Sequence, residues 1–182
     1  MEVRIVPLTL QVLAAEEFSG ADAARVLDVA PPVAWPPQFN DAGTRAHFRN
    51  LIIEHPGEEH WLGAYVVADL DGVPTLVGSA GFKGPPHGGT VEIGYAVADP
   101  YQRRGIGTAT VRALLTMAFS DAHVAAVRAE TLPTLTASRG LLTATGFVEI
   151  GRRHDRDDGE IIVYSIQRDA VPDENSPAQS TS

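Results

Sequence analysis

Residues 99–115 read DPYQRRGIGTATVRALL, in a chain whose 23 acidic side chains outnumber its 14 lysines and arginines. Arg103 and Arg104 stand side by side in this stretch, and Gly105 and Gly107 lack the Cβ that would keep a ligand from the main chain. The apolar spacing after Gly107 predicts a helix, whose N-terminus carries unpaired N–H groups and a partial positive charge. The stretch is therefore interpreted either as a cradle for a phosphate or pyrophosphate, or as a tight turn with solvated arginines.

Two other phosphate-binding loops can be compared with this stretch. The P-loop pattern G-x-x-x-x-G-K-[ST] is absent. The dinucleotide fingerprint needs Gly or Ala at its third position, where this chain has Thr110, although Glu130 lies near the place of a ribose-binding acid. The hairpins predicted before the loop do not suit a doubly wound parallel sheet, so a nicotinamide-binding protein remains the weaker alternative.

The loop must be positioned by strands and helices that the hydropathy pattern predicts. The expected strands are Val3–Val6, His60–Asp69, Thr75–Lys83, Val91–Ala98, Val124–Thr131, Phe147–Gly151 and Glu160–Gln167. The expected helices are Leu10–Val29 with a possible break at Ser19-Gly20, a helix from Thr44 as its cap to about His55, a helix through Val111–Phe119, and Thr134–Thr145. This order predicts an α/β (α+β) fold, a mixed sheet with helices on both faces.

Composition limits the class of protein. The chain has 182 residues and predicts one domain over residues 1–169, followed by a disordered polar tail over residues 170–182. No cysteine is present, the six histidines show no metal spacing, and no metal is expected. The net charge of −9 disfavours nucleic acid and anionic membranes, and no membrane or signal segment is predicted, so a soluble cytoplasmic protein is expected.

With these elements in order, the loop resembles a known motif. Gln102-Arg103-Arg104-Gly105-Ile106-Gly107 is similar to the Q/R-x-x-G-x-G/A motif of the GNAT superfamily, the GCN5-related N-acetyltransferases. EIGYAVADPYQRRGIGTATVRALLTMAF, followed by TASRGLLTATGF, resembles the RimJ/RimL-like branch, which acetylates protein N-termini or small-molecule amines. The resemblance covers about residues 1–168 and implies the GNAT fold, a mostly antiparallel central sheet of about six or seven strands.

The resemblance implies acetyl-CoA as co-substrate and a set of residues that bind it. The main-chain amides of the loop would hold the CoA pyrophosphate: Gln102, Arg103, Arg104, Gly105, Ile106, Gly107 and Thr108. The main chain near Tyr95, Ala96 and Val97 would bond the pantetheine arm where the strand splays from its neighbour. The N-x-x-S pattern of the branch reads Leu135-Thr136-Ala137-Ser138 here, so Ser138 matches and Leu135 replaces Asn. A Tyr acid found in many members is replaced by Leu142.

Acyl transfer to an amine needs a group that accepts the proton of the amine. Glu92 is the leading candidate, since it stands among the small residues Gly94 and Ala96, and its alternative role is a paired structural carboxylate. Ser138 is the candidate donor to the leaving thiolate, and its alternative role is a hydroxyl bonded to its own helix. Other possible bases are Glu54, Glu58, Glu59 and His60.

The acceptor side is predicted from the proline-rich loop Pro31–Asn40. Trp35 and Phe39 would wall a site for an amine with cation–π attraction, or else cover the core beneath the loop. The expected partner is a peptide N-terminus or a small-molecule amine, and the chain would act as a monomer or homodimer. The alternative function is a catalytically weak CoA-binding sensor or interaction module of the same fold, because of Leu135 and Leu142.

Overall fold

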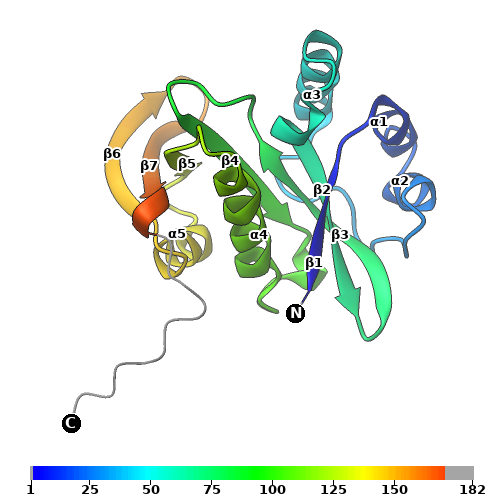
Figure 1. Cartoon of the computed structure of the whole chain (residues 1–182). Helices are drawn as coiled ribbons and strands as arrows, with labels where there is room; N and C mark the ends of the chain where they lie inside the picture. The colour runs from blue at the N-terminus through cyan, green and yellow to red at the C-terminus, as the bar shows by residue number, and fades with distance from the viewer. Residues whose placement is uncertain (1, 171–182) are drawn as a thin grey trace.

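The computed structural model describes residues 2–170 and builds them around one seven-stranded sheet in the order β1-β2-β3-β4-β5-β7-β6 (Figure 1). Within it only β4 and β5 run parallel, which confirms the mixed, mostly antiparallel sheet and does not suit the dinucleotide alternative. The predicted tail begins at residue 170, and its residues 171–182 lie outside the described ones. The strands are β1 Val3–Pro7, β2 Gly63–Leu70, β3 Val73–Phe82, β4 Thr90–Val97, β5 Ala126–Thr131, β6 Val148–Asp155 and β7 Gly159–Gln167.

The first helical region divides where Ser19-Gly20 predicted a break. Helices α1 (Leu10–Glu16) and α2 (Gly20–Val26) are separate because the Ser19 side chain accepts a hydrogen bond from the Asp22 amide and starts a new helix. Helix α3 spans Ala42–Glu54, and its cap is Asp41, which accepts from the Thr44 amide at 2.8 Å. The prediction of Thr44 as the cap is therefore wrong by three residues.

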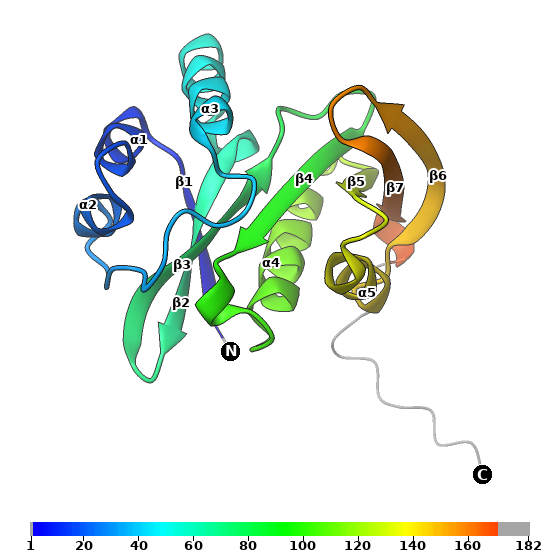
Figure 2. The ribbon, with the colours of Figure 1, turned by 180° about the vertical axis from the view of Figure 1, so that it is seen from behind.

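Helices cover both faces of the sheet, as expected, and each face has its own core. On one face α1, α2 and α3 pack against β2 and β3 through Leu13, Ile52, Tyr65 and Leu76. On the other face α4 (Ile106–Ser120) and α5 (Thr136–Ala144) contribute to the larger core. Figure 2 shows α4 behind β4 and the loop that joins α2 to α3 in front of the sheet.

Several predicted strand ends move in the structure. His60 belongs to a short 3₁₀ turn, Glu59–Trp61, and β2 starts only at Gly63. The strand predicted over Phe147–Gly151 extends as β6 to Asp155, through charged residues. This is possible because β6 is an edge strand, where Arg152 and Arg153 stay exposed and pair with acids of neighbouring residues and strands. Two more 3₁₀ turns are Asp99–Tyr101 and Arg168–Ala170.

The parallel pair of strands separates halfway along β4. Thr90 of β4 pairs with Ala126 of β5, and the pairing ends where Ile93 pairs with Ala129. The last four residues of β4 do not continue it. On its other edge β4 stays paired with β3 as far as Val97. The sheet therefore has an opening between Gly94–Val97 and the end of β5, which we call the β4–β5 opening.

Candidate active site

A cavity of about 720 Å³ lies at the β4–β5 opening. Side chains of adjacent residues in a strand point to opposite faces of the sheet. Ile93 and Tyr95 contact the core on the α4 face, while Glu92 and its register partner Arg128 point to the other face. The cavity is lined from both faces, so it passes through the sheet, and its lining includes Gln38, Phe39, Lys83, Tyr95, Arg103, Gly105, Gly107, Glu130, Thr131, Ser138, Leu141 and Arg153.

On the α4 face the cavity ends at the glycine loop. Gly105 takes the N-cap position of α4 with a φ of 81°, and no described side chain caps this helix. The Ala109 amide is the first to bond back along the helix, to the Gly105 carbonyl, so the amides of Ile106, Gly107 and Thr108 lack helical partners. These three amides at an uncapped helix end are unpaired donors of the kind that bind anions at helix N-termini, and the predicted cradle stays a prediction.

The two glycines serve different purposes. A Cβ on Gly105 would meet nothing within 4 Å, so the requirement there is the left-handed backbone. A Cβ on Gly107 would lie 2.8 Å from Leu141 Cδ1 of α5. Gly107 therefore lets α4 and α5 approach each other at the cavity wall, a packing role that the sequence did not indicate.

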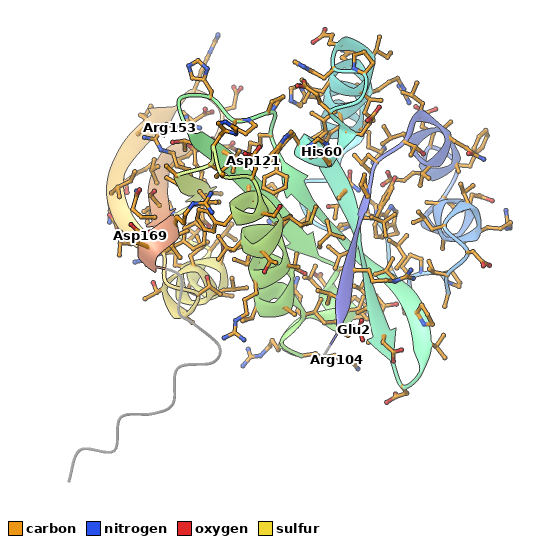
Figure 3. The ribbon with its side chains drawn as sticks, in the orientation of Figure 1. Glu2, His60, Arg104, Asp121, Arg153 and Asp169 are labelled. Carbon is orange, nitrogen blue, oxygen red and sulfur yellow. The ribbon has the colours of Figure 1, made fainter. Side chains whose placement is uncertain are left out.

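The arginines also differ. Arg103 lines the cavity and has a φ of 60°, while Arg104 is exposed and is not among the lining residues. Figure 3 places Arg104 at the start of α4 and Arg153 at the far end of this half of the sheet. Ile106 contributes its amide to the loop, while its side chain is buried in the larger core.

The end of β4 presents main-chain groups to the opening. The Lys83 amide bonds to Glu92 O and the Ala98 amide to Val77 O, so the even-numbered residues of β4 face β3. By alternation Tyr95 and Val97 turn their main-chain groups toward the opening, whereas Ala96 pairs with Ser79. The Gln102 side chain donates to the Val97 carbonyl at 2.9 Å. The amide and carbonyl of Tyr95 and the Val97 amide are thus turned toward a ligand lying in the opening.

Helix α5 supplies the second wall on this face. Leu135 takes its N-cap position, and Leu135 and Ser138 both line the cavity. The Ser138 Oγ and the Tyr95 hydroxyl are 3.0 Å apart, a bond from α5 to β4 across the opening. Thr131, at the end of β5, also lines the cavity, and its buried hydroxyl has no hydrogen-bond partner among the described residues.

On the opposite face the cavity is bordered by charged side chains. Lys83, the first residue after β3, lines the cavity and forms an ion pair with Glu92, which is itself not among the lining residues. Arg153 of β6 donates to both carboxylate oxygens of Glu130, at 2.9 and 2.7 Å. These hydrogen bonds lower the pKa of Glu130, which stays ionised near neutral pH. The mouth on this face therefore carries fixed charges of both signs.

The structure separates the two aromatic residues predicted for the acceptor site. Phe39 lines the cavity and is 54% exposed. Trp35 packs against the second core, where its Nε1 donates to Glu16 at 2.8 Å, and it is not among the lining residues. The alternative bases Glu54, Glu58, Glu59 and His60 are likewise not among the lining residues.

Glu16 holds the loop that carries Phe39. Its carboxylate is 5% exposed and accepts hydrogen bonds from Trp35, from Asn40 at 2.7 Å and from the Tyr65 hydroxyl at 2.5 Å. Burial and the neighbouring carboxylate raise the pKa of Tyr65, so its hydroxyl remains a donor. Trp35 and Asn40 flank Gln38 and Phe39 in sequence, so these bonds fix both ends of the segment at the cavity mouth.

Sequence reasoning missed Glu16, Lys83, Arg153 and Gln38. A signal existed for Glu16, which follows Val12 and Leu13 at the spacing of one helix face. Lys83 and Arg153 come from strands far apart in the chain, and only the sheet order brings them to one cavity.

Metal clusters and membrane-spanning helices are both absent from the described residues. No three histidine or carboxylate side chains within residues 2–170 are grouped so that they could hold a metal ion. None of the helices in that part of the chain is both long enough and apolar enough to cross a membrane.

Comparison with known proteins identifies the family. A family model described as an acetyltransferase (GNAT) domain matches residues 8–148, and the chain belongs to this family. The fold and the glycine loop before α4 therefore confirm the resemblance drawn from the motif. A search of curated proteins gave no match.

Solved structures share the fold at low sequence identity. Mycobacterium smegmatis RimJ in complex with CoA-disulfide is 21% identical with a TM-score of 0.62, over 94% of this chain and 84% of that one. The ribosomal-protein-S5-alanine acetyltransferase of Vibrio fischeri is 20% identical with a TM-score of 0.62, over 93% and 94% of the two chains. The Escherichia coli ribosomal-protein-S18-alanine N-acetyltransferase is 20% identical with a TM-score of 0.58, over 97% and 99%. At these identities the neighbours show that the fold is shared.

The role of Glu16 can be tested by Glu16→Gln. The new amide would place an NH₂ group against buried donors and leave one of them unpaired, so we expect a loss of about 2 to 4 kcal/mol in the free energy of unfolding. The measurement is urea unfolding, with Glu17→Gln as the matched control because Glu17 is exposed and pairs only with surface Arg49. The control should change stability by less than about 0.5 kcal/mol. Equal stability of the two variants would contradict the anchoring role.

Proposed function

We propose that the protein is an acetyl-CoA-dependent N-acetyltransferase that acts on a primary amine, either a peptide N-terminus or a small molecule. The observation that carries this proposal is the cavity that passes through the β4–β5 opening. The glycine loop on one face suits the CoA diphosphate, and the opposite face is open to a second substrate. Two substrates that meet in the opening from opposite faces would react by direct attack, favoured by their orientation.

In this proposal CoA is bound by residues on the α4 face of the cavity. The amides from Gly105 to Thr108 hold the diphosphate, and the Gln102 side chain, bonded to Val97 O, braces the loop against β4. The pantetheine arm bonds the main chain of Tyr95 and Val97. Ala96 and Leu135 contribute cavity surface rather than main-chain bonds to the opening. Arg103 and Arg104 add positive charge near the diphosphate.

The acceptor enters from the other face, past Phe39. Glu92 is the proposed base, because its carboxylate lies on the acceptor face only one residue before Ile93, where the pairing of β4 and β5 ends. The Glu92 carboxylate forms an ion pair with Lys83 and would accept the proton of the amine directly or through water. Phe39 offers an exposed aromatic surface to an amine at the mouth.

The proposed function is tested by offering acetyl-CoA and a panel of amines and peptides to the purified protein while CoA thiol release is measured. We expect amine-dependent release by the wild type. In Gly107→Glu the new side chain would press on Leu141 at the cavity wall and add a negative charge beside the loop amides, and we expect affinity for CoA to fall about 100-fold or more, roughly 2.7 kcal/mol, by calorimetry. Gly140→Glu is the matched control, since Gly140 is exposed on α5 and a Cβ there meets nothing within 4 Å.

Each outcome of this experiment has a distinct meaning. Tight CoA binding without turnover of any amine would favour the alternative of a CoA-binding sensor. CoA binding that survives Gly107→Glu would contradict the assignment of the loop. Stabilisation by NAD with no response to CoA would support the nicotinamide alternative, because a ligand stabilises only the protein that binds it.

The role of Glu92 is tested by Glu92→Gln. We expect turnover to fall about 10- to 100-fold, with little change in the KM for acetyl-CoA and the largest loss at lower pH, where more of the amine is protonated. Glu149→Gln is the control, because Glu149 is also an ion-paired acid but lies on the edge strand β6, away from the β4–β5 opening. Wild-type turnover in Glu92→Gln would leave Glu92 as the structural partner of Lys83.

A further inference from the structure

Tyr95 and Ser138 form a hydrogen-bonded pair inside the cavity. Their hydroxyl oxygens are 3.0 Å apart, and both residues line the cavity on the α4 face. Tyr95 belongs to β4 and Ser138 to the first turn of α5, so the bond joins the two walls between which a ligand in the opening must lie. The main chain of Tyr95 faces this opening, while its hydroxyl is placed deeper, against the helix.

Either hydroxyl of this pair can donate to the other. The surroundings of the Tyr95 hydroxyl raise its pKa, chiefly through desolvation, so the phenol keeps its proton at neutral pH. A hydroxyl has one hydrogen to donate. If the phenol donates to Ser138 Oγ, the hydrogen of Ser138 is free to point into the cavity. Leu135 and Leu141 line the cavity beside the pair, and such aliphatic surface strengthens a hydrogen bond by excluding water.

The position of the pair matches the leaving group rather than the attacking amine. The glycine loop and α5 border the α4 face of the cavity, whereas Lys83, Glu92 and Phe39 belong to the opposite face. A thioester bound from the glycine loop keeps its sulfur on the α4 face when its acyl group reaches the opening. The Tyr95–Ser138 pair is on that face.

We propose that Tyr95 is a positioning residue for acyl transfer, which orients the Ser138 hydroxyl so that it donates a hydrogen bond to the sulfur of the departing thiolate. This inference rests on the proposed function. In the reaction a C–N bond forms, the C–S bond breaks, and the sulfur keeps the electron pair of that bond. The amine loses one proton and the thiolate takes up one proton, so the reaction balances without a further reactant. Ser138 and Tyr95 stabilise the charge on sulfur without losing their own protons.

The test is steady-state kinetics of the full chain with acetyl-CoA and the best amine of the panel. Tyr95→Phe removes only the hydroxyl, and we expect kcat to fall about 5- to 20-fold with an unchanged KM for acetyl-CoA and unchanged CoA affinity. Ser138→Ala should lower kcat at least as much. The double variant should be no slower than Ser138→Ala, because Tyr95 acts only through Ser138.

Tyr101→Phe is the matched control, since Tyr101 is buried in the same core, is not among the cavity-lining residues, and its hydroxyl accepts a hydrogen bond from the Val33 amide rather than contacting the pair. It should keep the kcat of the wild type. A Tyr95→Phe variant with wild-type kcat, or losses that multiply in the double variant, would overturn the proposal while the transferase function stands. A wild type that binds CoA yet turns over no amine would instead remove the proposed function, and this inference with it.

Discussion

The separation of β4 from β5 after Ile93 and Ala129 is the constraint on which the candidate site depends. A continuous sheet would pair the polar groups of Tyr95 and Val97 with β5 and leave no passage between its two faces. The opening leaves these groups for a ligand and lets a cavity join the glycine loop to the acceptor face. The Tyr95–Ser138 bond lies beside the opening, on the α4 face.

The remaining structure supports both edges of this opening. β3 holds the far edge of β4, and β7 holds β5 along its whole length, so neither strand can close the gap without losing its other partner. Helix α4 starts directly at the end of the opening, and Gly107 allows Leu141 of α5 to pack close beside it. On the opposite face Glu16 fixes the loop that brings Phe39 to the mouth.

Local patterns in the sequence predicted much of this fold and many of the residues that line the α4 face of the cavity. The glycine loop, the strand before it, the helix after it and the break at Ser19-Gly20 all depend on residues close in the chain. Contacts between distant residues could not be predicted in this way. Trp35 was expected at the acceptor site because an aromatic ring in a proline-rich loop suggests binding, but its partner is Glu16 of α1. The ion pairs Lys83–Glu92 and Arg153–Glu130 depend on the order of strands in the sheet, which cannot be predicted from the spacing of residues along the chain.

A crystal structure of the chain with bound coenzyme A would test the central claim most directly. The account predicts the diphosphate within hydrogen-bond distance of the amides of Gly105 to Thr108, and the pantetheine arm between β4 and β5. It further predicts the sulfur on the side of the opening that faces Ser138. Coenzyme A bound at another surface, with this cavity empty, would contradict the account.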